Sequence, residues 1–247
     1  MKTKKTGKTM RVAGLLLALV LVTSCFVGGT FAKYVTSGGG TDEARVAKFG
    51  VKVTATGDVF AEEYDAKDPK VDGYDGKVIA KSVISSDKTK HEKVVAPGTA
   101  KENALTVSVT GTPEVAVKVE YVAHVTFNES LTEPDNWKDK DGHYYCPLVI
   151  TVNGTPYNGL DYESATDFEN AVEGAINGLT KNYPANTDLS QSSSKGVAIS
   201  WEWPFEGATG AKGSQSDEKD TYLGDQAAAG KAATVGIVVA TTVTQID

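Results

Sequence analysis

The stretch that decides the fold is 115-VAVKVEYVAHVTF-127, in which apolar and polar side chains alternate. Every odd position is apolar, while Lys118, Glu120 and His124 stand at even positions. Successive side chains of a strand point to opposite faces, so this pattern predicts a long strand with one buried face. A sheet with one buried and one solvated face is typical of antiparallel β proteins.

Other segments repeat the alternation on both sides of this strand. The predicted strands are 46–54, expected as the half-buried first strand of the core, 77–84, 105–109, 148–152, 197–203 and 235–245. Pro97-Gly98 suits a type II turn, and Asn153-Gly154 predicts a two-residue hairpin. The pattern predicts an all-β protein, a jelly-roll-like antiparallel β-sandwich with long loops.

One segment has helical rather than strand spacing. Residues 167–179 place Phe168, Val172, Ala175, Ile176 and Leu179 on one face, which predicts one short packing helix against the sheet. Thr166 and Glu169 have the spacing of a capping box at its start. Residues 217–230 offer a second, short helical segment.

The N-terminus has the features of an export signal. Five basic residues precede or border the apolar run Val12–Val22, which is shorter than the roughly 20 residues that a spanning helix needs. Thr30 and Ala32 supply small side chains at the −3 and −1 positions, so residues 1–32 are predicted to be a signal peptide and Lys33 the new N-terminus. Two alternatives stay open: an uncleaved anchor, and a lipoprotein acylated at Cys25 within Val22-Thr23-Ser24-Cys25.

The predicted domain organisation follows from this cleavage. Residues 33–45 are expected to be a flexible N-terminal segment, because Ser37–Thr41 contains three consecutive glycines. Residues 46–247 are expected to form a single β-sandwich domain. Cys146 would be the only cysteine of the exported chain, which excludes an internal disulfide and favours a small buried apolar role.

The cleavage region 26-FVGGTFAKY-34 resembles that of the TasA/camelysin group of Gram-positive exported proteins. Residues 44–51, the Pro97-Gly98 turn before the central strands, and the segments 201–206 and 217–224 are similar to body features of such proteins. The resemblance implies a partner, the signal peptidase of SipW type, and a secreted, extracellular or cell-surface structural protein of the biofilm matrix that assembles with itself into fibres. It also implies that Lys33, Tyr34, Val35 and Thr36 act as a donor segment that completes the sheet of the next subunit.

Charge limits the partners. The chain has 25 Lys+Arg and 32 Asp+Glu, and residues 1–32 hold five basic and no acidic residues, so the remainder carries 20 against 32, a net charge of −12. Nucleic acid and anionic lipid would both be repelled. Contact with a membrane is expected only through the signal peptide or lipidation at Cys25.

No catalytic, cofactor or metal site is predicted, so we expect the protein not to be an enzyme. The three histidines do not stand in a His-Glu-x-x-His motif, which would supply the zinc ligands of a metalloprotease. The resemblance to camelysin nevertheless implies a metal-dependent endopeptidase as one alternative. The acidic loop 57–76 and the segment Asp139–Gly142 lack the ligand spacing of a calcium loop, and the latter is better explained as a turn. A monomeric surface binding module, using Trp137 or residues 64–74, is the other alternative.

Overall fold

The computed structural model describes residues 45–65, 82–86, 88–127, 136–191, 196–205 and 207–246, and residues 46–247 group into one compact unit. Several predictions of the sequence lie outside the described residues. These are the signal peptide 1–32, its cleavage site at Thr30, Ala32 and Lys33, the acylation site Cys25, and the donor segment Lys33, Tyr34, Val35 and Thr36.

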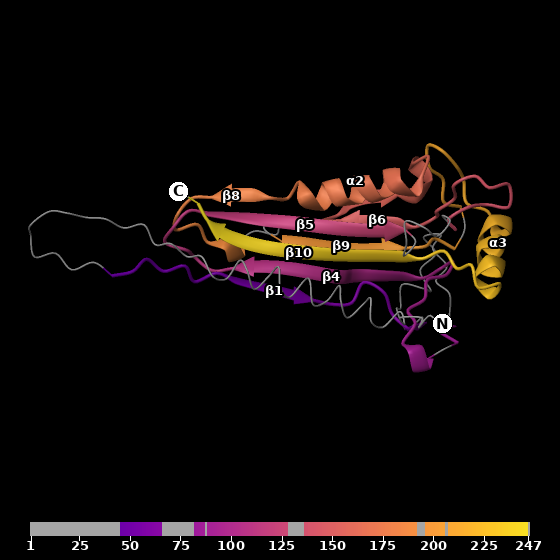
Figure 1. The fold of residues 1–247 in the computed structure, drawn as a ribbon, viewed down its shortest axis with the longest axis horizontal. Helices are drawn as coiled ribbons and strands as arrows, with labels where there is room; N and C mark the ends of the chain where they lie inside the picture. The colour runs from indigo at the N-terminus through magenta and orange to yellow at the C-terminus, as the bar shows by residue number, and fades with distance from the viewer. Residues whose placement is uncertain are drawn as a thin grey trace, which may run out of the picture. The chain divides into compact units, whose positions relative to one another are not determined.

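Two antiparallel sheets form the body of the protein (Figure 1). The first has the order β1-β4-β9-β6-β7, with bounds Lys52–Thr56, Ala100–Thr110, Gly196–Glu202, Val149–Val152 and Thr155–Asn158. The second has the order β10-β5-β8, with bounds Val235–Gln245, Val117–Phe127 and Lys181–Tyr183. A small pair joins β2 (Glu63–Asp65) to β3 (Ser82–Ile84). The predicted all-β, antiparallel sandwich-like fold is confirmed.

Two α-helices and three short 3₁₀ turns accompany the strands in the described part of the chain. The helices are α2 (Ala165–Asn177) and α3 (Asp217–Ala228), and the 3₁₀ turns are η2 (Lys88–Lys90), η3 (Gly159–Asp161) and η4 (Leu189–Gln191). Both predicted helical segments are therefore confirmed. The N-cap of α2 differs from the prediction, because Ser164 Oγ accepts from Asp167 N at 3.1 Å. Glu169, predicted to belong to the cap, has another partner.

The strand predicted at residues 115–127 is β5, and its odd residues are buried as predicted. Their exposed fractions lie between 0% at Val117 and 6% at Ala123, whereas Val122 on the opposite face is 55% exposed. β5 pairs with β10 along its entire length, from Val117 opposite Gln245 to Phe127 opposite Val235. The strict alternation of apolar and polar side chains thus correctly predicts a strand that buries one face.

The prediction for the first strand is wrong in its extent and its burial. β1 begins at Lys52 rather than near residue 46, and it pairs only with β4, at the edge of its sheet. Phe49 is 41% exposed and Val53 is 40% exposed. Among the described residues β1 has a neighbouring strand on one side only, and its side chains remain largely exposed. Before β1, Lys48 exchanges two 2.8 Å hydrogen bonds with Glu114, one of them to the Glu114 carboxylate.

Both predicted turns are confirmed. Thr99 N donates to Ala96 O at 3.0 Å across Pro97-Gly98, and Gly98 has φ of 80°, as the third residue of a type II turn requires. Asn153 and Gly154 both have positive φ, 47° and 84°, between β6 and β7. Two consecutive positive φ angles are the signature of a type I′ hairpin turn.

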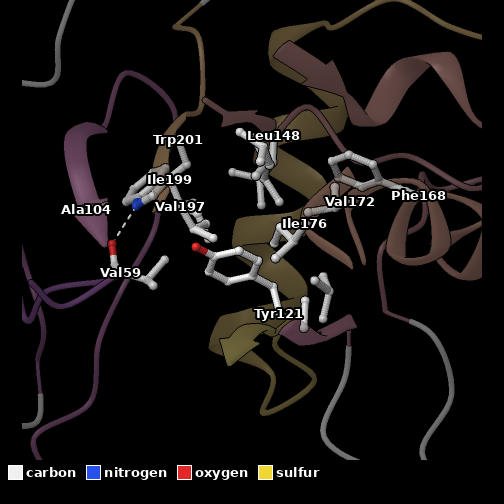
Figure 2. Packing of buried hydrophobic residues seen from close by; sticks show 14 of the residues in the cluster. Val59, Ala104, Tyr121, Leu148, Phe168, Val172, Ile176, Val197, Ile199 and Trp201 are labelled. Carbon is white, nitrogen blue, oxygen red and sulfur yellow. Dashed lines mark hydrogen bonds between the residues drawn. The ribbon is translucent and has the colours of Figure 1, made fainter. Parts of the chain in front are cut away.

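The core joins α2 to both sheets through aliphatic and aromatic side chains. Figure 2 shows Val172 and Ile176 of α2 beside Leu148, with Tyr121 of β5 below them. Five rings follow one another with centroid separations of 5.0 to 5.9 Å, in the order Trp203, Trp137, Phe127, Phe168 and Tyr162. Trp201 fixes the chain before β2, since its Nε1 donates to Val59 O at 2.6 Å (Figure 2).

We expect Phe168→Ala to lower the free energy of unfolding by about 3 to 5 kcal/mol, because it leaves a cavity between Phe127 and Tyr162. Urea denaturation followed by tryptophan fluorescence measures the change. Ile84→Ala is the control, since Ile84 is 54% exposed and its truncation should change stability by less than about 0.5 kcal/mol. Equal effects of the two variants would contradict this description of the core.

Candidate functional site

The candidate functional feature of this fold is formed by the edges of the second sheet. β5 is flanked by β10 on one side, but on its other side β8 pairs only with Val117, Lys118 and Val119. The backbone of residues 121–127 would therefore present unpaired donors along that side. An exposed row of this kind is a template for pairing with another chain.

Side chains on and just after α2 occupy those donors one by one. We call the four residues that accept these hydrogen bonds the ladder acceptors. Phe127 N donates to Glu169 Oε1 at 2.6 Å, and Val125 N donates to Glu173 Oε1 at 2.8 Å. Ala123 N donates to Asn177 Oδ1 at 2.7 Å, and Tyr121 N donates to Thr180 Oγ1 at 3.1 Å. Residues 181–183 then continue the same side as β8. This side of β5 is closed from Val117 to Phe127.

The ladder acceptors can follow the strand because four residues of the helix and two residues of the strand cover nearly the same distance. Four residues of an α-helix advance about 6.0 Å, and two residues of an antiparallel strand advance about 6.8 Å. Helix positions 169, 173 and 177 therefore keep pace with strand positions 127, 125 and 123 as the two elements run in opposite directions. The same helix directs Phe168, Val172 and Ile176 into the core, and each stands one residue before a ladder acceptor of the helix.

The sequence contains a signal for this ladder, which the prediction of a packing helix left out. Glu169, Glu173 and Asn177 follow the apolar stripe with the same four-residue period. Polar residues on that flank would ordinarily face solvent. Glu173 has only 25% of its side chain exposed, and His124 Nδ1 lies 3.4 Å from its Oε1.

The remaining outer strands carry features that discourage pairing, with one exception. Among the described residues, β1 and β7 lie at the edges of one sheet, and β10 and β8 at the edges of the other. β1 has five residues and contains Lys52, β7 has four and contains Pro156, and β8 has three and contains Lys181. Short length, lysine and proline are the usual protections of an edge. β10 has eleven residues and none of these features.

The segment Asp139–Gly142 is a turn, as predicted. Gly142 N donates to Asp139 O at 3.0 Å, and Gly142 has φ of 82°. The Asp139 carboxylate accepts from Asp141 N at 3.1 Å and His143 N at 3.0 Å, and it pairs with Lys219 Nζ at 3.2 Å. Burial would raise the pKa of Asp139, but these partners outweigh it and hold the pKa below its usual value.

Ligand atoms of Asp139, Asp141 and His143 lie within 4.8 Å of one another, which is the spacing of a metal-binding group. The contacts of Asp139 are those of a hairpin turn, and its oxygens already have donors. The other two side chains are exposed. The geometry is therefore explained by the turn itself.

A second buried carboxylate fixes the start of α3. Asp220 is 7% exposed, and it accepts from Tyr145 Oη at 2.6 Å and from Gln215 Nε2 at 2.7 Å. Burial raises the pKa of Asp220 above 3.8, opposed by the hydrogen bonds from Tyr145 and Gln215 and by the Trp203 indole. Burial also raises the pKa of Tyr145, and Asp220 raises it further. The hydrogen bonds from Tyr145 and Gln215 thus tie Asp220, in the first turn of α3, to the rest of the body.

The aromatic residues proposed for a surface binding site are not exposed as that alternative requires. Trp137 is 1% exposed and its Nε1 donates to Thr234 O at 2.9 Å, so its assignment to an exposed site is wrong. Tyr64 is half-buried, lies edge-on to Trp201, and its hydroxyl accepts from Ala61 N at 2.8 Å. Residues 66–74 lie outside the described part. Cys146 is fully buried, as predicted.

An open hollow of roughly 360 Å³ lies beside β2 and is lined mainly by charged residues. Both of its lysines contact Asp58. Lys93 Nζ lies 3.5 Å from Asp58 Oδ1, and Lys101 Nζ donates to Asp58 O. The hollow does not bring a nucleophile and a base together.

Comparison with known proteins returned no matching family model and no matching curated protein. In the described part of the chain, no helix has both the length and the apolar character needed to cross a membrane.

We expect Glu173→Ala to lower the free energy of unfolding by about 1 to 3 kcal/mol, because the Val125 amide loses its acceptor. Glu173→Gln keeps an acceptor oxygen and should cost less than about 1 kcal/mol. Urea denaturation of both variants tests the ladder, and amide hydrogen exchange at Val125 should accelerate only in the alanine variant. Equal stability of the two variants would contradict a role for the ladder.

Asp220 should make stability decline as pH rises. The folded protein holds this proton more tightly than the unfolded chain, so stability falls from pH near 4 up through the raised folded pKa. Asp220→Asn has no such proton. The difference in unfolding free energy, wild type minus variant, should therefore decrease over that window in urea titrations at several pH values. A difference that stays constant or grows with pH would refute the assignment.

Proposed function

We propose that the protein is an exported structural subunit of the cell surface or biofilm matrix, that it is not an enzyme, and that it assembles into fibres. Residues 1–32 act as the signal peptide, a SipW-type signal peptidase cuts after Ala32, and Lys33 begins the mature chain. Lys33, Tyr34, Val35 and Thr36 then add to a strand edge of the next subunit.

The single observation that best supports this proposal is the set of strand edges in the sandwich. Added strands bind mainly through backbone hydrogen bonds, which demand no particular side-chain charge. That mode suits a chain whose predicted mature form carries −12 charges. Copies with that charge repel one another, so attraction through the backbone has to outweigh the repulsion.

The location of the donor segment also supports the proposal. It is separated from Val46 by only nine residues, three of which are consecutive glycines. Glycine leaves the backbone free to adopt many directions, so a segment of this composition can reach a neighbouring molecule. Tyr34, Val35 and Thr36 are aromatic or β-branched, which are the residue types enriched in strands.

Val35→Pro should reduce filament formation by at least about tenfold, because proline cannot donate a backbone hydrogen bond to a ladder. The protein is purified after export, its N-terminus is established by intact mass, and filaments are counted by electron microscopy and sedimentation. Val35→Ala and Thr41→Pro are the matched controls, which change the side chain or place proline outside the donor segment. Undiminished filaments from Val35→Pro would defeat the proposal of donation.

A further inference from the structure

We propose that β10 is a self-association surface, at which two copies of this chain pair their β10 strands in antiparallel orientation around a two-fold axis. This contact does not rest on the proposed donation of the N-terminal segment. It follows from the geometry, composition and length of β10.

The open side of β10 can be assigned residue by residue. The amides of Tyr121, Ala123 and Val125 point to the ladder acceptors, away from β10, so the even residues of β5 face β10. Ile246 N donates to Ala116 O at 2.9 Å, which agrees with this phase. Even residues of β10 oppose even residues of β5, as Ala240 opposes Val122. The odd residues of β10 therefore direct their N–H and C=O groups to the open side.

β10 also differs from the other outer strands because it contains no charged residue and no proline. Residues 232–246 contain no charge and no proline, and residues 235–245 consist mainly of valine, threonine and isoleucine. Uncharged, β-branched strands of this length are the ones most prone to pair at an edge. Val238 is 59% exposed on the outer face, beside the exposed Val122 of β5. Nothing in the strand discourages a partner.

Charge favours a second copy as the occupant. An uncharged strand meets an identical strand without repulsion, whereas the rest of the chain is strongly acidic. On the outer face of β5, Lys118 Nζ lies 2.6 Å from Glu120 Oε1, so these two charges largely neutralise each other. The β10 edge is thus a place where two acidic copies can approach closely.

The centre of β10 fixes the register. Ala240 is the middle of Val235–Gln245, so pairing Ala240 with Ala240 of the second copy aligns all eleven residues. Val235 then opposes Gln245, and Val239 opposes Thr241. The six odd residues form hydrogen-bonded pairs and make about 12 backbone hydrogen bonds in total. Specific protein interfaces contain roughly 10, so the contact has the number of hydrogen bonds that a specific interface ordinarily makes.

The register also keeps each face of the combined sheet uniform. Even residues oppose even residues, so Val238, Ala240 and their outer neighbours form one surface across both copies. Ile237, Val239 and Val243 pack against the core but remain half exposed at the edge. The odd residues of β10 in the second copy would cover the exposed sides of these three residues.

Ala240→Cys tests the contact by its geometry. Ala240 opposes itself in a non-hydrogen-bonded pair, where Cα atoms lie about 4.5 Å apart, within disulfide range. The full chain is expressed in a Gram-positive host, purified in the form that the cells produce, mildly oxidised, and run on a non-reducing gel. We expect a disulfide-linked dimer as the main species. Val122→Cys is the matched control, since its two copies would lie about 14 Å apart across three strand spacings.

Ala240→Lys tests the same contact without a covalent bond. It places two lysines opposite each other and should raise the dissociation constant at least tenfold in sedimentation equilibrium, while Val122→Lys on the neighbouring strand leaves it within threefold. Circular dichroism and the urea midpoint establish that both variants fold. A monomeric wild type, equal crosslinking of the two cysteine variants, or equal effects of the two lysine variants would overturn the proposal. Loss of filaments in Val35→Pro with the dimer retained separates this contact from donation.

Discussion

The closure of β5 is the constraint on which the rest of the structure depends. This strand packs its odd side chains into the core, and each backbone amide beneath them needs an acceptor, because an unpaired buried amide costs about 1 to 3 kcal/mol. β8 supplies acceptors at one end, and the ladder acceptors Glu169, Glu173, Asn177 and Thr180 supply the other. The position and direction of α2 follow from that requirement.

One helix therefore meets two demands with adjacent residues. Phe168, Val172 and Ile176 fill the core, and the residue after each accepts a hydrogen bond from β5. A fourth strand beyond β5 would satisfy the same amides but would move the open edge outward. The helix ends the sheet on that side. In the described part of the chain, the edges that remain in this sheet are the three-residue β8 and the eleven-residue β10, so β10 is the long edge at which the sheet can be extended.

The sequence predicts the buried strand β5 better than the edge strand β1, and the reason is physical. Alternation along residues 117–127 reflects burial of one face, a local property that any strand of this kind displays. Whether a strand is central or outer depends on partners far along the chain, so residues 46–54 alternate although β1 is an exposed edge. Trp137 is similar: it packs against Trp203 and donates to Thr234 O, 97 residues away along the chain. The ladder needed knowledge of what lies beside the helix, which periodicity does not contain.

The two proposed contacts differ in symmetry, and the difference decides what they could build. Donation of an N-terminal segment joins unlike surfaces and repeats from subunit to subunit, which produces an open fibre. Pairing of β10 joins like surfaces around a two-fold axis and closes after two copies. A chain with only the first contact forms separate fibres, and one with only the second stops at a dimer. A chain with both contacts, in which the donor segment occupies an edge other than β10, joins fibres side by side into a network. Neutral β10 strands then form the points of contact between otherwise repelling acidic surfaces.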